Sequence, residues 1–290
     1  MFIRKKKISG REYYYVVHST RIGSKVKKIE HYIGLNKPDG KELDKFRKEF
    51  DTIKFYLLTN KKKLEKLKKN YQNFLNTATK DAIRKYEENA VIQFTYDSNR
   101  IEGSSMTLKD TKALLLNGIT PGEKPLRDIK ETENHQKAFF YMKNYKDDIK
   151  TDLILELHNI LKTGVTQDAG MFRDRGVVVG NLVPVKADMI KIEIKNLFEW
   201  YMNNKHLHPI ELAAVFHCIF ERIHPFFDGN GRVGRLLLNH ILMHSGFPLV
   251  IIQNKNRRRY YNALRRADDG NYLYMIKLIV AELEHQKKWV

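Results

Sequence analysis

The twelve residues from His224 to Arg235, HPFFDGNGRVGR, bring together side chains that could act on a nucleotide. Asp228 is a hard oxygen donor that suits Mg²⁺, which proteins usually bind through one or two carboxylates plus substrate phosphates. Arg232 and Arg235 can form charge-assisted hydrogen bonds to phosphate oxygens, and the intervening glycines let backbone N–H groups approach an anion closely. His224 can accept a proton near neutral pH. The sequence therefore predicts a loop that holds a nucleoside triphosphate beside a general base.

Part of this stretch, Gly229–Gly234, formally matches the G-x-G-x-x-G pattern of dinucleotide-binding loops. That interpretation requires a strand before the glycines and an acidic residue about 20 positions later. The preceding segment, 212–223, instead has apolar residues at helical spacing, and 250–252 is apolar. The partner motifs of a kinase glycine loop and the lysine of a P-loop are absent from the sequence. A plain turn between two helices rarely needs this set of histidine, aspartate, asparagine and arginines.

The elements that must position the loop are mainly helical, because apolar residues recur at helical spacing through most of the chain after residue 40. A helix is expected over 209–223 and another over 235–246, and the second adds a partial positive charge at the loop. Two segments predict β structure: 2–34, as a β-hairpin or small antiparallel sheet, and 176–186, as a hairpin. We therefore expect a mainly α fold.

A turn cluster, NKPDG at residues 36–40, is the best candidate for a domain boundary. We expect three parts, which are a small N-terminal β element over 1–40, a lysine-rich helical region over 41–84, and a catalytic core over 85–290 that contains the loop.

Composition limits the class of protein. The chain has 290 residues, of which 42% are hydrophobic and 11% aromatic, which excludes a disordered chain. No apolar run approaches the ~18 residues of a membrane helix, the N-terminus lacks the apolar stretch of a signal peptide, and a single cysteine excludes a disulfide framework. We expect a soluble cytoplasmic protein without a membrane partner.

The formal net charge of +19 is concentrated in the first 90 residues, which carry 24 basic and 11 acidic side chains. This basic region could attract nucleic acid or an acidic protein. A solvated, lysine-rich surface is the plainer interpretation, because charge runs are common on exposed helices. Nucleic acid is therefore an unfavoured but open partner.

The stretch 224–235 matches the motif H-x-F-x-[D/E]-G-N-G-R-x-x-R at every fixed position, and the chain thereby resembles the Fic domain family. The resemblance covers roughly residues 85–285 and includes Gly170–Arg173 and the pair Tyr260 and Tyr261. It implies a Fic-type helical bundle with a β-hairpin flap.

Fic proteins typically transfer AMP from ATP to a Ser, Thr or Tyr hydroxyl of a protein, with Mg²⁺. The resemblance implies that His224 is the base, that Asp228 holds Mg²⁺, and that Asn230 stabilises charge on the α-phosphate. It implies that Arg232 and Arg235 bind the outer phosphates. The expected nucleotide-binding residues are Val177, Val178, Val179, Gly180, Asp228, Gly229, Asn230, Gly231, Arg232, Val233, Gly234, Arg235, Tyr260, Tyr261 and Asp268.

Two of these regions have further implied roles. Residues 177–180 correspond to the flap, whose edge can bind a segment of the target protein by strand addition. Asp268 occupies a position that is often Asn in relatives, and an ionised carboxylate only accepts hydrogen bonds, so the preference for adenine is open here.

Ser98, Glu102 and Gly103 match the family's inhibitory pattern, [S/T]-x-x-x-E-[G/N]. Positions 98 and 102 share one face of a helix. Glu102 could pair with Arg235 and so block the arginine that the γ-phosphate needs. The resemblance therefore implies an autoinhibited enzyme. Some relatives also use this glutamate to remove AMP, so AMP-removing activity is possible here as well.

Two alternatives stay open from the sequence. One is a Fic-type transferase of another nucleotide or of a phosphoryl group. The other is a non-enzymatic adaptor that binds nucleic acid or protein through its basic N-terminal region. The protein could also form a homo-oligomer.

Overall fold

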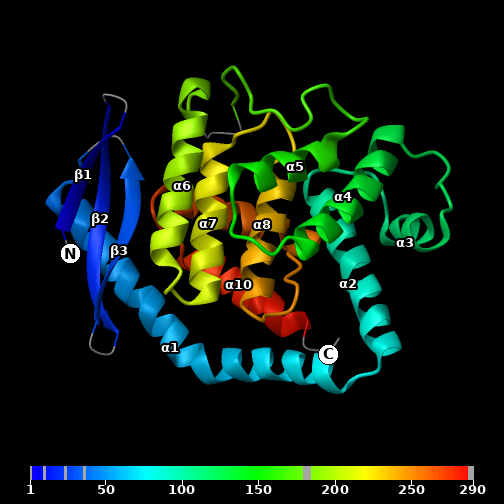
Figure 1. Cartoon of the computed structure of the whole chain (residues 1–290), viewed down its shortest axis with the longest axis horizontal. Helices are drawn as coiled ribbons and strands as arrows, with labels where there is room; N and C mark the ends of the chain where they lie inside the picture. The colour runs from blue at the N-terminus through cyan, green and yellow to red at the C-terminus, as the bar shows by residue number, and fades with distance from the viewer. Residues whose placement is uncertain (1, 9–10, 23–24, 35–36, 179–183, 287–290) are drawn as a thin grey trace.

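The computed structural model describes residues 2–8, 11–22, 25–34, 37–178 and 184–286. Within them the chain is mainly helical, as expected (Figure 1). The α-helices are α1 (Gly40–Thr77), α2 (Lys80–Ile101), α3 (Leu108–Asn117), α4 (Leu126–Asn144), α5 (Thr151–Lys162), α6 (Ile190–Asn204), α7 (Pro209–Ile223), α8 (Asn230–His244), α9 (Arg257–Asp268) and α10 (Leu273–His285). The 3-10 turns are η1 (Ala187–Met189) and η2 (Asn254–Asn256).

The centre of the molecule is the helical pair α7 and α8, which lie side by side (Figure 1). Twelve of the α7 residues are buried, so neighbouring elements cover nearly the whole circumference of this helix rather than a single apolar face. The two helices approach closely at Gly234, where a Cβ atom would meet Glu221 Oε1 at 2.5 Å. The loop that joins them is thereby held on a rigid, packed base.

The remaining helices surround this pair. α6 packs against α7, α4 and α5 pack against α8, and α9 and α10 pack against α7 on the C-terminal side. α1 runs from the N-terminal sheet along the lower edge of the view to α2, which then contacts α4 and α8 (Figure 1). The contacts of α2 with α4 and α8 place the C-terminal end of α2 near the centre of the fold.

Local interactions explain where α2 begins and where it ends. Thr79 caps the N-terminus by accepting a hydrogen bond from the Ala82 N–H. At the other end Glu102 is the C-cap, and Gly103 follows with φ of 98°, a conformation that favours glycine. The chain turns away there, and the Glu102 side chain is left at the tip of the helix.

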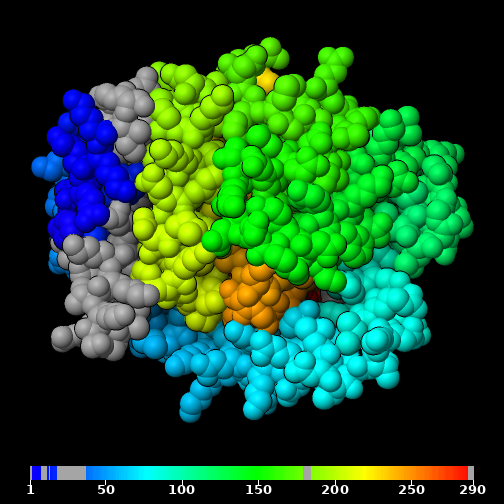
Figure 2. Space-filling view, in the orientation of Figure 1, coloured from blue at the N-terminus to red at the C-terminus, as the bar shows by residue number. Residues whose placement is uncertain are grey.

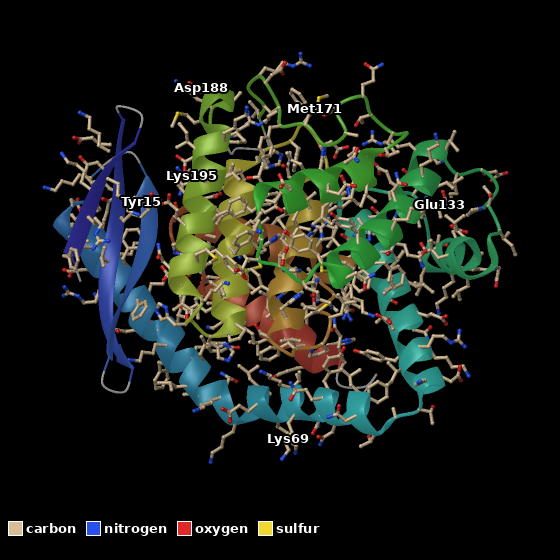
Figure 3. All side chains as sticks on the ribbon, in the orientation of Figure 1. Tyr15, Lys69, Glu133, Met171, Asp188 and Lys195 are labelled. Carbon is tan, nitrogen blue, oxygen red and sulfur yellow. The ribbon has the colours of Figure 1, made fainter. Side chains whose placement is uncertain are left out.

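The N-terminal segment forms a three-stranded antiparallel sheet in the order β1 (Phe2–Ile8), β2 (Arg11–Ile22) and β3 (Lys25–Gly34). The sheet lies at one end of the molecule, and the space-filling view shows it beside α6 (Figures 1 and 2). Tyr15 is buried with Met189, and it lies on the side of the sheet that faces α6, where Lys195 and Asp188 are labelled (Figure 3). The expectation of a small antiparallel sheet over 2–34 is confirmed.

Two expectations differ in detail from the structure, and a third is not tested by it. α8 begins at Asn230 rather than at 235, so the second half of the motif is helical. The described flanks of the expected hairpin, 176–178 and 184–186, contain no strand, and residues 179–183 lie outside the described residues. α2 runs unbroken through residues 84 and 85, and the expected division of the chain into three parts stays a prediction. None of the described helices combines the length and apolar character that a membrane crossing needs.

Candidate active site

The loop between α7 and α8 is shaped by two residues with positive φ. His224 ends α7 with φ of 52°, and Gly229 precedes α8 with φ of 87°. A positive φ is unusual for histidine, and such strain is common at functional sites. The first N–H that bonds inside α8 is that of Val233, which donates to Gly229 O at 3.0 Å. The N–H groups of residues 230–232 therefore form an anion cradle at the positive end of the helix.

Asn230 holds this loop in shape with its side chain. Its Oδ1 accepts from the Phe226 N–H at 2.9 Å, and its Nδ2 donates to Phe226 O at 2.8 Å. The Asn230 side chain is buried, and both ends of its amide group bond to the backbone of Phe226. The expectation that Asn230 stabilises charge on the α-phosphate stays a prediction, and the backbone N–H of Asn230 is the group that remains available for it.

A histidine on α5, His158, also contacts the loop and helps to hold it in place. His158 stacks on Phe226 with a centroid distance of 3.7 Å. Its Nδ1 accepts from the Gly170 N–H at 3.0 Å, so the other nitrogen, Nε2, carries the hydrogen and donates to Asp228 O at 3.0 Å. Burial lowers the pKa of His158 to about 4, and the neutral ring is a fixed structural part of the loop.

The candidate base, His224, is oriented by its neighbours. Its Nδ1 lies 3.3 Å from Glu221 O, an acceptor, so Nδ1 carries the hydrogen and Nε2 is left to accept a proton. Arg173 Nε donates to His224 O at 2.7 Å. Burial lowers the pKa of the His224 imidazole, which keeps the ring neutral at pH 7, the state that a general base requires.

Asp228 lies in a cluster of charged groups. Its Oδ2 accepts from Arg127 Nη2 at 2.5 Å and from Lys162 Nζ at 2.7 Å, and its Oδ1 lies 3.1 Å from Arg232 Nη2. Lys162 and Arg232 also pair with Glu131, each at 2.7 Å. Burial alone would raise the pKa of the Asp228 carboxyl, but Arg232, Lys162 and Arg127 outweigh burial and hold the pKa below its usual range.

These charges bear on the Mg²⁺ that the family implies. The ionised Asp228 side chain is 40% exposed at the cavity, which fits a cation held by one carboxylate and by substrate phosphates. The described residues contain no group of three or more His, Cys, Asp or Glu side chains placed to hold a metal.

The loop forms one wall of a cavity of about 800 Å³. Eight of the expected nucleotide-binding residues line it, together with His224 and Glu102: Val178, Asp228, Gly229, Asn230, Gly231, Tyr260, Tyr261 and Asp268. The base candidate, the anion cradle and the two tyrosines thus face a single space large enough for a nucleotide.

Five more of the expected nucleotide-binding residues lie among the described residues and are not part of the cavity lining. Val233 is buried in the core and Gly234 faces α7, and the expectation that these two contact the nucleotide stays a prediction. Arg232 is buried against Glu131. Val177 lies outside the cavity lining, and Val179 and Gly180 fall outside the described residues.

Arg235 is held by the end of α2. Its Nε donates to Ser98 Oγ at 3.0 Å, one Nη donates to Ser98 O at 2.9 Å and to Glu102 Oε1 at 2.8 Å, and the other donates to Tyr260 Oη at 3.3 Å. The expected pairing of Glu102 with Arg235 is present, and Ser98 lies on the same face of the helix. Gly103 contributes only the turn that follows.

The lining of the cavity also contains the two carboxyl groups of Asp268 and Glu221. Burial raises the pKa of Asp268, although Arg222 opposes this effect. Burial raises the pKa of Glu221 to about 8, so this side chain is largely protonated at neutral pH. A protonated carboxyl can donate a hydrogen bond to a nucleobase, which an ionised one cannot.

Sequence reasoning missed several residues that the structure brings to the site. They are Arg127, Glu131, His158, Lys162 and Glu221, which lie on α4, α5 and α7. A charged residue inside a helix normally faces solvent, so only the tertiary contacts identify these groups as site residues. Arg173, noted only as part of the resemblance, proves to connect His224 to the segment before α6, because its guanidinium also donates to Val185 O.

Comparison with known proteins agrees with this geometry. Residues 148–242 match the model of the Fic/DOC family. The Protein adenylyltransferase Fic of Aedes aegypti is 35% identical over 209 residues, which cover 69% of this chain and 42% of that protein. The Protein adenylyltransferase fic-1 of Caenorhabditis elegans is 32% identical over 211 residues, which cover 70% and 42%. The chain spans less than half the length of these curated relatives.

Two solved structures share the fold. Fic-1 from C. elegans matches with a TM-score of 0.73 and 27% identity, over 87% of this chain and 77% of that one. A Fic domain-containing signaling protein from Bacteroides thetaiotaomicron matches with a TM-score of 0.71 and 26% identity, over 78% and 94%. With the motif loop, its cavity and the family match in place, the chain belongs to the Fic/DOC family.

Proposed function

We propose that the protein is an adenylyltransferase that moves AMP from ATP to a Ser, Thr or Tyr hydroxyl of a protein. The observation that carries this proposal is that His224 and the anion cradle of α8 face one cavity of about 800 Å³. The relatives named protein adenylyltransferase support the same activity.

Each part of the site has a task in this reaction. The cradle N–H groups hold phosphate oxygens and neutralise the charge that develops there. Arg235, once released from Glu102, binds the outer phosphates. Arg232 is buried between Asp228 and Glu131 and so orients the loop rather than reaching into the cavity. Most of the catalysis is therefore positioning and charge neutralisation, as is usual in phosphoryl and nucleotidyl transfer.

The chemical step is a displacement at the α-phosphorus. His224 Nε2 takes the proton from the attacking hydroxyl, whose oxygen forms a bond to the α-phosphorus. The bond from that phosphorus to the oxygen that bridges to the β-phosphate breaks, and pyrophosphate leaves with the electron pair. The neutral state of His224 and the hydrogen on its Nδ1 prepare the ring for this proton transfer.

We also propose that Asp228 holds Mg²⁺ during this reaction. When bound, the metal would neutralise phosphate charge and orient the triphosphate. Asp228 is the ionised carboxylate on the loop, and its exposure to the cavity supports this assignment.

Glu102 is proposed to inhibit the enzyme from within. Its carboxylate holds Arg235 and lies over Gly231 in the anion cradle, where a Cβ atom at Gly231 would overlap Glu102 Oε1. A triphosphate and this carboxylate compete for the same donors. Movement of the tip of α2 would therefore be needed before ATP can bind productively.

The target protein is proposed to bind beside Val178, at the start of the flap. Val178 is 74% exposed and lines the cavity, so a chain that lies along this segment would pass the mouth of the site. Addition of an extended target segment would place its hydroxyl near His224.

Mass spectrometry tests the reaction. The protein with Glu102→Gly is incubated with Mg²⁺ and ATP, GTP, CTP or UTP in parallel, and its own mass is followed. A gain of one AMP with ATP is expected, which His224→Ala in the same background abolishes and His244→Ala at the far end of α8 does not. Gain of another nucleotide, or of a phosphoryl group alone, would replace the donor or the reaction proposed here.

A further inference from the structure

Both oxygens of Asp228 already hold as many hydrogen bonds as a carboxylate accepts well. Oδ2 accepts from Lys162 and Arg127, and Oδ1 accepts from the Gly229 N–H at 2.6 Å and from Arg232. An ionised carboxylate offers about four lone-pair sites, so these four donors fill it. A metal ion that binds Asp228 must therefore displace one of them.

We infer that Lys162 is a built-in counter-cation of Asp228, which excludes a free divalent ion and admits the metal only as its complex with the nucleotide. This inference rests on the proposed function, because it assigns the metal to Asp228. It concerns the order of binding and the chemical form in which the metal enters.

The charges of the cluster favour this order. Arg127, Lys162 and Arg232 are cations, and Asp228 and Glu131 are anions, so the cluster carries a net charge of about +1 when all five are ionised. A free divalent cation meets repulsion from this cluster at short range. A metal–triphosphate complex is an anion and is attracted by the same cluster and by the cradle.

Burial distinguishes Lys162 from Arg127. The Lys162 side chain is 1% exposed, whereas that of Arg127 is 58% exposed and is screened by water. Lys162 also lies directly under the loop, because a Cβ atom on Gly229 would meet Lys162 Cδ at 3.5 Å. Its ammonium is therefore fixed beside Asp228 and should dominate the competition with a metal.

The arrangement still permits the metal to enter. Lys162 Nζ lies 2.7 Å from Glu131 Oε1 as well as 2.7 Å from Asp228 Oδ2. If the metal takes Oδ2, the ammonium keeps its bond to Glu131 and is not left unpaired in the interior. Glu131 thus provides the second partner that makes the displacement feasible.

Titration with Mn²⁺ in the absence of nucleotide tests the inference, with free Mn²⁺ followed by electron paramagnetic resonance. Lys162→Met, which keeps the length of the side chain without the charge, should bind one Mn²⁺ at least tenfold more tightly than the unaltered protein. Adding Asp228→Asn to Lys162→Met should remove this site. Lys130→Met on the neighbouring α4, where the lysine donates to Gly164 O, should bind Mn²⁺ as the unaltered protein does.

The addition of a non-hydrolysable ATP analogue to the Glu102→Gly protein should tighten Mn²⁺ binding and reduce the difference that Lys162→Met makes.

Tight, Asp228-dependent Mn²⁺ binding by the unaltered protein in the absence of nucleotide would overturn the inference. A folded Lys162→Met protein that gains no Mn²⁺ affinity would also overturn it. If the Lys162→Met protein unfolds at a lower temperature than the unaltered protein, Lys162→Gln, which removes the charge but keeps a polar group, makes the same comparison: a gain of Asp228-dependent Mn²⁺ affinity supports the inference, and no gain overturns it. Because no turnover is measured, failure of AMP transfer would reject the proposed function and leave this result intact.

Discussion

Glu102 Oε1 accepts a hydrogen bond from Arg235 Nη2 at 2.8 Å, although the two residues are 133 positions apart in the sequence. The Arg235 side chain is 2% exposed and that of Glu102 is 28% exposed. The partner of a buried guanidinium is therefore a carboxylate at the solvent edge, which can leave without unfolding the core. Ser98 and Tyr260 would continue to hold Arg235 when it does so.

Removal of the Glu102 carboxylate should activate the enzyme. Glu102→Gly clears the cradle over Gly231 and frees Arg235, while Glu102→Gln keeps the shape and removes the charge. AMP incorporation from labelled ATP should rise at least about tenfold in Glu102→Gly, equivalent to ~1.4 kcal/mol, and by a smaller factor in Glu102→Gln. Glu199→Gln on the exposed face of α6 is the control. Equal incorporation by all four proteins would refute inhibition by Glu102.

Asn230 should prove more important for the shape of the loop than for direct contact with phosphate. Asn230→Ala leaves a buried Phe226 N–H and C=O without partners, which should lower the free energy of unfolding by about 2–5 kcal/mol in urea denaturation. Asn239 offers a control outside the cavity lining, because it clasps the backbone of Val250 at 2.7 and 3.0 Å, with a further bond from its Nδ2 to Arg235 O at 3.0 Å.

Both variants should lose similar stability, but they should differ in activity per folded molecule. In a Glu102→Gly background, Asn239→Ala should transfer AMP normally, whereas Asn230→Ala should be impaired because its loop no longer presents the cradle. Normal transfer by a folded Asn230→Ala protein would show that the clasp does not shape the site.

The sequence predicted the parts of the site that are contiguous or that lie on one helix face. The helix over 209–223 was predicted with the bounds that the structure shows, because its apolar spacing is regular and Pro209 marks its start. The pairing of Glu102 with Arg235 was predicted from the resemblance and is confirmed. The early start of α8 was missed because Gly231 and Gly234 disfavour a helix on propensity alone, and tertiary packing overrides that preference.

The support beneath the loop could not be predicted. Lys162 and Glu131 look like ordinary polar helix residues in the sequence, yet both are buried and pair with each other beneath Asp228. Glu131 and Asp228, the two partners of Lys162, lie 31 and 66 positions from it in the sequence, and local periodicity does not encode such contacts. The clasp by Asn230 was missed for a different reason: the amide group could serve either phosphate or backbone, and only the folded loop decides between them.

Glu221 should make the stability of the fold depend on pH. Its Oε1 is buried and has no hydrogen-bond partner among the described residues, and burial raises its pKa to about 8 from an ordinary 4.5. Arg235 opposes this rise and Glu102 adds to it. Between these two pKa values the folded state binds a proton that the unfolded state has released, so the contribution of Glu221 to stability is fully present below pH 4.5 and is lost as the pH rises through about 8.

Urea denaturation from pH 5 to pH 9 measures this effect as the difference between the unaltered protein and Glu221→Gln. The free energy of unfolding of the unaltered protein should fall relative to that of the variant by up to about 1.4 kcal/mol per pH unit, since one proton is involved. Subtraction removes the contributions of other groups, and Glu199→Gln should show no such trend. A difference that stays constant across this range would mean that Glu221 is already ionised in the folded protein, paired through the charge of Arg235.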